Sequence, residues 1–234
     1  MRPILLIAFN FARMQWLTLL IMAVYLVGIA GAFALNQQNQ EVLFFLRSQP
    51  LYVMFLALML AVPAIQTDRK SRRLLAVLSK GIHRWQYLGG IICGCAFITS
   101  VFSFLVWATT YVLCVRGGEE TTGLLLLSFA LLVSCVTIAS AGLMYSTFLH
   151  PLLATGAAAI TLALPVLFAT RGFDVHLLRP FFPVAWLGEF IVHYEFGNVR
   201  GLWAMIDANA ILAVFFWIAG AMIFARRDVT ISPE

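Results

Sequence analysis

Charged residues are scarce in this sequence. Only 11% of its 234 residues are Asp, Glu, Lys or Arg and 62% are hydrophobic, whereas a soluble domain is about one-quarter charged and about half apolar. This composition excludes a soluble fold for the chain as a whole and predicts an integral membrane protein. In such a protein the net charge of +5 bears on orientation in the membrane, and we expect no nucleic-acid partner.

Metal-binding and catalytic patterns are also missing. The four cysteines lie in apolar runs and form no CxxC pair, so we expect neither a disulfide framework nor a zinc site: Cys93, Cys95, Cys114 and Cys135. Glu189 and His193, with His176 and Glu195 nearby, could bind a metal, but their spacing fits a solvated cluster better. The serines and threonines of the apolar runs have no partnered base, and we expect them to bond to helix backbone. We therefore expect no catalytic residue, metal site or cofactor site.

Ionisable residues are absent from the middle of the apolar runs. Proton- or ion-coupled carriers need such groups inside the bilayer, so a secondary transporter is disfavoured. Asp207 lies near one end of the last run. We expect it to be an interfacial residue or a partner for a helix start, rather than a substrate ligand.

Six apolar runs approach the length of about 20 residues that a helix needs to cross a membrane. We predict spans at 16–35, 51–66, 86–115, 123–146, 152–170 and 204–225. The first run ends in small residues that resemble a cleavage site, but it is longer than a signal core of about 7 to 15 residues, so we expect it to be retained. The predicted fold is an all-α integral membrane protein of one transmembrane domain over residues 1–234.

Basic residues are divided unevenly between the two sides of this topology. The side that holds both termini has ten of them: Arg2, Arg13, Arg69, Lys70, Arg72, Arg73, Lys80, Arg84, Arg226 and Arg227. The other side has five: Arg47, Arg116, Arg171, Arg179 and Arg200. By the positive-inside rule, both termini and the basic loop are predicted to be cytoplasmic.

Two segments are predicted to lie in the membrane interface. In residues 1–14, Arg2, Asn10 and Arg13 fall within about 80° on a helical wheel and the rest is apolar, which suits an interfacial helix; a simple extension of the first span is the alternative. On the outer side, residues 171–203 alternate charged and aromatic residues. We expect an interfacial helical stretch there.

The loop between the second and third spans carries the most distinctive pattern. The segment QTDRKSRRLLAVLSKGIHRW, residues 66–85, holds six basic residues around a short apolar core. We predict an amphipathic helix over residues 71–80, with Gly81 as its C-terminal cap. Leu74, Leu75 and Leu78 occupy an arc of about 100°. Because about ten residues are too few for an isolated helix, either the lipid surface or a cytoplasmic partner must cover this stripe.

The layout as a whole resembles the permease subunit of a type-2 ABC exporter. The resemblance rests on the amphipathic N-terminal helix, six spans, the loop TDRKSRRLLAVLSKGIHRWQYLGG, the outer interfacial stretch and the C-terminal FARRDV. The loop departs from the family pattern in two ways: Asp68 is the only acidic residue before the helix, and no lysine follows the glycines.

The resemblance implies an elbow helix at residues 1–14 and a coupling helix at 71–80. In the family pattern the coupling helix sits in a cleft of a separate nucleotide-binding ATPase. Leu74, Leu75 and Leu78 would be its apolar anchors, with Arg72, Arg73 and Lys80 around them. The chain has no GxxxxGK[ST] phosphate loop, so the partner ATPase would bind ATP and Mg.

Further partners follow from the same resemblance: a second permease subunit, identical or related, and the lipids of a bacterial or archaeal cytoplasmic membrane. The complex would move a substrate or do work on an outer partner. The alternative from the residues alone is a non-transport membrane scaffold, or a small membrane enzyme, whose basic loop binds lipid.

Overall fold

The computed structural model describes residues 2–17, 20–21, 23–24, 27–28, 31, 54–71, 73–79, 81–117, 123–170 and 199–226. Within these ranges the regular structure is helical, without a strand. Residues 54–61 form a helix, and the named helices are α1 (Arg2–Met14), α4 (Ala64–Lys70), α5 (Arg73–Leu78), α6 (Arg84–Gly117), α7 (Leu124–Ser146), α8 (Pro151–Thr170) and α10 (Val199–Arg226).

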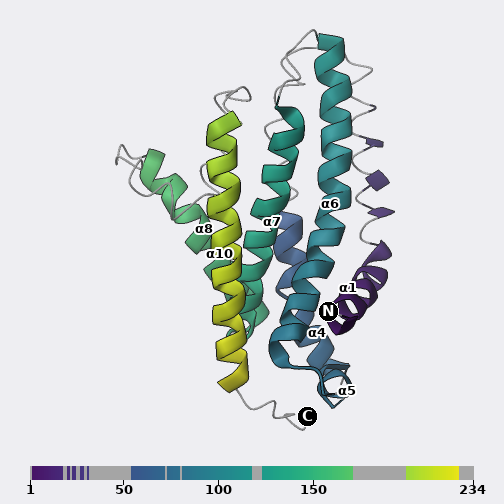
Figure 1. Ribbon diagram of the computed structural model, residues 1–234, viewed down its shortest axis with the longest axis vertical. Helices are drawn as coiled ribbons and strands as arrows, with labels where there is room; N and C mark the ends of the chain where they lie inside the picture. The colour runs from purple at the N-terminus through teal and green to yellow at the C-terminus, as the bar shows by residue number, and fades with distance from the viewer. Residues whose placement is uncertain are drawn as a thin grey trace.

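Three of the described helices are long and apolar enough to cross a membrane. They are α6 over Arg84–Val112, α7 and α10. They stand side by side in Figure 1, with α4 and α5 at the lower end of the group and α8 leaning away from it. The prediction of long apolar helices near 86–115, 123–146 and 204–225 is confirmed, and it indicates a membrane protein.

The other three predicted spans stay predictions. Most of 16–35 lies outside the described residues, and so does the beginning of 51–66. The described part of 51–66 is a helix that is interrupted by a turn at Val62 and Pro63 before α4 begins. Residues 151–170 form α8. The outer stretch predicted at 171–203 lies outside the described residues except for the first residues of α10.

Helix α7 occupies the centre because its small residues let neighbours approach closely. A Cβ built on Gly142 would lie 2.9 Å from Cγ2 of Val62. On another side of α7, a Cβ on Gly220 of α10 would lie 3.3 Å from Cα of Met144. Small residues at such contacts are the usual means of packing helices in membranes. The run of small residues at 137–142, TIASAG, therefore packs against helices of this same chain.

Buried hydroxyl groups bond mainly to helix backbone, as the sequence predicted. Oγ1 of Thr99 donates to the carbonyl of Cys95 at 2.9 Å, and Oγ of Ser134 donates to that of Ala130 at 2.9 Å. Thr137 reaches across to α10, where its Oγ1 lies 2.9 Å from the carbonyl oxygen of Asn209. These bonds satisfy polar groups where no water would be present.

Helix α1 packs against the lower half of α6 (Figure 1). Two glycines one helical turn apart form the contact surface on α6. A Cβ on Gly90 would lie 2.7 Å from Cβ of Ile7, and a Cβ on Gly94 would lie 2.8 Å from Cδ1 of Phe11. Any larger residue at these positions would push α1 away. The predicted helix over 1–14 is confirmed, and it ends in a turn at Gln15.

Candidate functional site

The basic loop folds into two short helices rather than the single helix predicted over 71–80. Helix α4 ends at Lys70, where the N–H of Ser71 bonds to the carbonyl of Thr67 at 3.0 Å. Helix α5 then covers only six residues, Arg73–Leu78. Gly81 has a φ of 74°, which favours glycine. Because it lies three residues beyond Leu78, Gly81 turns the chain toward α6 and does not cap α5, which corrects the prediction.

Among the described side chains of α5, one is fully buried in this chain. Leu74 has no exposed surface and belongs to the main core, and Val77 packs against the same core. The guanidinium of Arg73 contacts the sulfur of Met14, at the end of α1. The loop is therefore held both to the helix core and to α1.

Leu74 was predicted to be an apolar anchor in a cleft of the ATPase, and its burial in this chain changes that role. Its side chain anchors α5 to the core and leaves no surface for a partner. Arg72 and Lys80 lie outside the described residues, and so do the side chains of Leu75 and Leu78. The docking roles of these four residues stay predictions.

A hydrogen bond connects the loop to α6. The hydroxyl of Tyr87 donates to Oδ2 of Asp68 at 2.7 Å. Tyr87 is almost fully buried in the core, and its ring lies 6.2 Å from that of Phe224, near the end of α10. The lone acidic residue of the loop thus bonds to a buried side chain between α4 and α10.

Arg84 connects the start of α6 to the end of α10. Its Nη1 donates to the carbonyl oxygens of Phe224 at 2.6 Å and Ala225 at 3.0 Å. The guanidinium carbon also lies 5.6 Å from the centre of the Phe224 ring. A cation beside the last carbonyls of a helix satisfies groups that lack an intrahelical partner and interacts favourably with the helix dipole. Loop, α6 and α10 are therefore linked through this end of the molecule.

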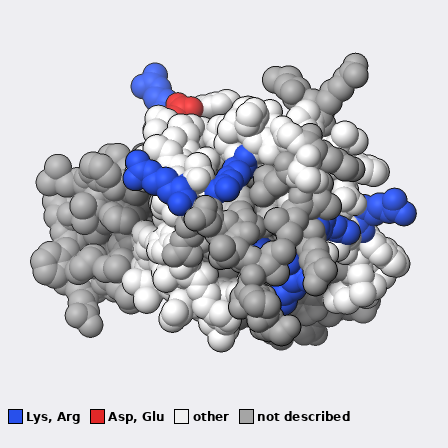
Figure 2. All heavy atoms as spheres, turned by 90° about the horizontal axis from the view of Figure 1, so that it is seen from below, with Lys and Arg blue, Asp and Glu red and all other residues white. Residues whose placement is uncertain are grey.

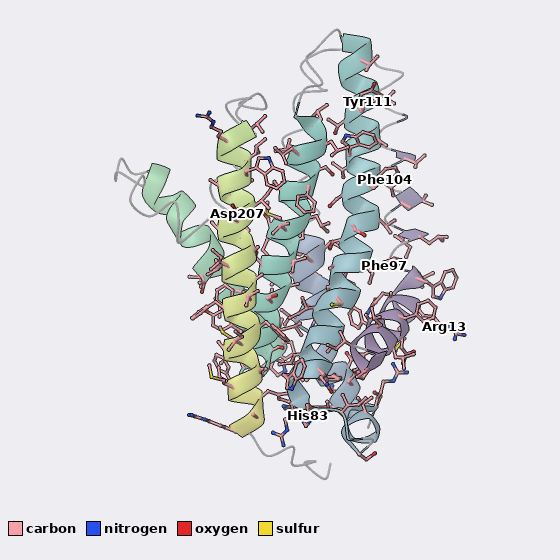
Figure 3. The ribbon with its side chains drawn as sticks, viewed as in Figure 1. Arg13, His83, Phe97, Phe104, Tyr111 and Asp207 are labelled. Atoms are coloured by element: carbon pink, nitrogen blue, oxygen red, sulfur yellow. The ribbon has the colours of Figure 1, made fainter. Side chains whose placement is uncertain are left out.

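Basic side chains gather at the same end. Figure 2 shows Lys and Arg side chains across the described part of the lower surface, with acidic residues at one place only. Arg69 and Lys70 of α4 and Arg226 of α10 are exposed there. Arg13 of α1 is exposed too, and Figure 3 shows it pointing away from the helices. The side chain of Arg2 lies outside the described residues.

One of the two roles expected for Asp207, a partner for a helix start, does not fit the structure, and the other, an interfacial residue, stays a prediction. Helix α10 begins at Val199, so Asp207 lies more than two turns inside it and cannot partner the helix start. The residue is exposed, on the upper half of α10 in Figure 3. Its neighbours on the same face are large and apolar: Trp203, Ile211, Val214 and Phe215. The upper part of α10 thus presents one carboxylate in an apolar surface.

The metal hypothesis receives no support from the part of the chain that the structure covers. Among the described residues there is no group of three or more His, Cys, Asp or Glu side chains that could hold a metal ion. His176, Glu189, His193 and Glu195 lie outside those residues.

Comparison of the chain with models of known protein families, with curated proteins and with solved structures gives no match.

Sequence reasoning did not identify the contacts that hold the loop in place. The signal for one of them was visible, because Asp68 is the lone acidic residue among six basic ones. Nothing in the sequence pairs it with Tyr87, nineteen residues away, because that contact depends on how α4 packs beside α6.

Proposed function

We propose that this chain is the permease subunit of an ATP-driven type-2 ABC exporter, and that the α4–α5 loop receives the movement of a separate ATPase. The observation that carries the proposal is the position of α5. It is a short helix at the basic end that contacts α1 through Arg73 and packs on the core through Leu74 and Val77. Through Asp68, Tyr87 and Arg84, the same end joins α6 and α10.

The shortness of α5 supports a docking role. Six residues are far too few for a stable isolated helix, so its position depends on what surrounds it. Leu74 and Val77 supply one set of contacts, on the side that faces the core. On a wheel of 100° per residue, position 75 lies about 130° around α5 from that side. In this proposal, Leu75 is the apolar anchor that enters the cleft of the ATPase.

The contacts of the loop would let it transmit force. ATP binding can shift the permease only as far as the bound and free states of the ATPase differ in their contacts with it. A loop whose Leu74 and Val77 pack on the core and whose Asp68 bonds to Tyr87 would carry α6 with it when it moves. The linkage of Arg84 to the last carbonyls of α10 extends that movement to a second long helix.

Helix α1 fits the elbow role in this proposal. One face packs on Gly90 and Gly94. A second face exposes the large apolar side chains of Leu5, Leu6 and Phe9. Asn10 and Arg13 are also exposed there. A helix with an apolar face toward lipid and a narrow polar strip toward water is typical of the membrane interface.

The proposed complex contains a second permease subunit and two ATPase subunits that bind ATP and Mg. It lies in a bacterial or archaeal cytoplasmic membrane, with both termini of this chain in the cytoplasm. We place the second permease subunit against the upper part of α10. A carboxylate that faces lipid inside a span carries a cost that reaches about 2.5 to 3.5 kcal/mol at the centre. Because Asp207 lies more than two turns inside α10, a protein neighbour is favoured there.

The proposal is tested by the partner it requires. A reading frame beside this one should encode an ATPase with a GxxxxGK[ST] phosphate loop, and the two proteins should copurify from membranes. Purified together, they should hydrolyse ATP, and replacing the phosphate-loop lysine of the ATPase should abolish hydrolysis while the complex stays assembled. If this chain instead purifies alone from membranes in which that ATPase is present, a scaffold or small membrane enzyme becomes the better reading.

A further inference from the structure

A groove of about 590 Å³ lies between the beginning of α6 and the end of α10, apart from the α4–α5 loop. The lining residues are His83, Arg84, Trp85, Trp217, Ile218, Ala221, Met222 and Ala225. Figure 3 shows His83 at the lower end of the molecule, where α6 and α10 lie close together. The groove therefore lies at the basic end of the two long helices.

One end of the groove is polar and carries positive charge. Nη1 of Arg84 is held there by the carbonyls of Phe224 and Ala225, which fixes the position of the guanidinium. The His83 side chain is exposed beside it. Helix α6 also begins here, with the N–H of His83 bonded to Oε1 of Gln86 at 3.2 Å, and the start of a helix favours an anion. Guanidinium, imidazole and helix start all suit a negatively charged group.

The rest of the groove is apolar and follows α10 toward the middle of the molecule. Ile218 and Met222 are about half exposed on its surface. Trp85 and Trp217 form an edge-to-face pair with ring centres 6.0 Å apart, and Nε1 of Trp217 lies 3.3 Å from the carbonyl oxygen of Trp85. Paired tryptophans beside charged residues are typical of headgroup depth in a membrane. From Trp217 to Ala225 the wall extends about 12 Å.

We propose that this groove binds an anionic phospholipid. Its phosphate would lie at Arg84 and His83, and one acyl chain would run along Ile218 and Met222 below the Trp217 ring. A molecule with a negative head and an apolar tail matches both ends of the groove. A soluble anion would leave the apolar wall bare, and an uncharged lipid would leave the positive end without a partner. Basic pockets between membrane helices on the cytoplasmic side are known to bind such headgroups.

The first test measures lipid retention by the full chain. The protein is equilibrated in detergent with equal amounts of phosphatidylglycerol and phosphatidylcholine, and the lipids that stay bound are counted by native mass spectrometry. We expect phosphatidylglycerol to be retained about fivefold more than phosphatidylcholine, the ratio that one basic contact near a headgroup supplies. Equal retention of the two lipids would overturn the proposal.

A matched pair of substitutions isolates the charge. Ala225 is exposed in the groove, so Ala225→Glu and Ala225→Gln add side chains of nearly the same shape. We expect Ala225→Glu to abolish the preference for phosphatidylglycerol and Ala225→Gln to keep it. Lys70→Gln removes a basic residue on α4 outside the groove and should also keep it. Equal preferences in the two Ala225 variants would show that charge does not select the lipid.

A second test locates the bound lipid. The full chain is reconstituted in phosphatidylcholine vesicles that contain phosphatidylglycerol with brominated acyl chains, which quench tryptophan fluorescence on contact. Quenching should exceed that by brominated phosphatidylcholine, and the excess should disappear in the double variant Trp85→Phe/Trp217→Phe, which removes both tryptophans of the groove. Trp203→Phe is the control, because Trp203 is exposed on the same helix far from the groove. An excess that survives the double variant would place the lipid elsewhere and overturn the assignment.

Discussion

Helices α1 and α5 are both short helices at the lower end of the molecule (Figure 1), but they are held in different ways. Helix α1 has 13 residues, and its Ile7 and Phe11 lie directly over Gly90 and Gly94. Helix α5 has six residues; among its described side chains Leu74 is fully buried and Val77 packs on the same core. The first contact is a close approach of two helices along more than one turn. The second is a contact of two neighbouring side chains with polar contacts around it.

The difference assigns the two helices to different tasks. A helix that packs closely on glycines of its neighbour cannot shift without losing those contacts along its length. Helix α1 therefore moves with α6 as one body. Helix α5, whose described contacts with the core are those of Leu74 and Val77, can open locally at lower cost, because local stability follows the number of buried contacts. The basic loop is thus the part of this end that a partner could stabilise or displace.

The largest expected effect comes from filling the α1 contact. In Gly94→Leu the new Cβ would lie 2.8 Å from Cδ1 of Phe11 and 3.1 Å from the carbonyl oxygen of Ala8. Overpacking of this kind costs about 1 to 3 kcal/mol, so we expect a clearly lower free energy of unfolding in detergent. Gly156→Leu is the matched control, because a Cβ there meets nothing within 4 Å. Equal losses in the free energy of unfolding of the two variants would refute the close packing of α1 on α6.

A smaller effect is expected from breaking the bond between loop and core. Tyr87→Phe removes the hydroxyl that donates to Asp68 at 2.7 Å and keeps the ring against Phe224. A hydrogen bond to a charged group contributes about 1.5 to 3 kcal/mol, but Asp68 is partly exposed and water can replace the lost donor. We therefore expect a loss of about 1 kcal/mol in the free energy of unfolding. The same loss in the double variant Tyr87→Phe/Asp68→Asn would show that the pair acts as a unit.

The smallest global effect is expected where the buried leucine of α5, Leu74, is shortened. Leu74→Ala should free the loop while the rest of the core stays folded, because α5 can open without global unfolding. Trypsin should then cleave faster after Lys70, and the free energy of global unfolding should fall by no more than the free energy that local opening of α5 costs. Leu125→Ala removes the same atoms from an exposed leucine and should leave cleavage unchanged. A large global loss in Leu74→Ala would mean that α5 belongs to the scaffold, like α1.

The sequence predicted the elements of this end better than their contacts. The helix over 1–14 follows from its apolar pattern and forms with nearly the same bounds, Arg2–Met14. The loop helix was predicted over 71–80 and covers only 73–78, since the chain turns at Ser71 after α4. The apolar stripe of a helix indicates that another surface must cover it, but the sequence does not identify that surface. For Leu74, that surface is the core of the same chain.

The long helices show the same limit. Their length and apolar composition are local properties and were predicted for α6, α7 and α10. Two sets of contacts join residues that are far apart in the chain. Helix α1 packs on Gly90 and Gly94, and Arg84 donates hydrogen bonds to the last carbonyls of α10. Spacing along the sequence could mark those residues as small or charged, but only packing in three dimensions shows what they contact.

The central claim is that a separate ATPase binds α5. Its most direct test is copurification of that ATPase with two variants of this chain, Leu75→Asp in α5 and Thr67→Asp on the exposed side of α4. The account predicts that Leu75→Asp loses the ATPase at least tenfold, because a carboxylate would replace a buried apolar anchor, while Thr67→Asp retains it. Full retention of the ATPase by Leu75→Asp, in a chain that is still folded and in the membrane, would contradict the account.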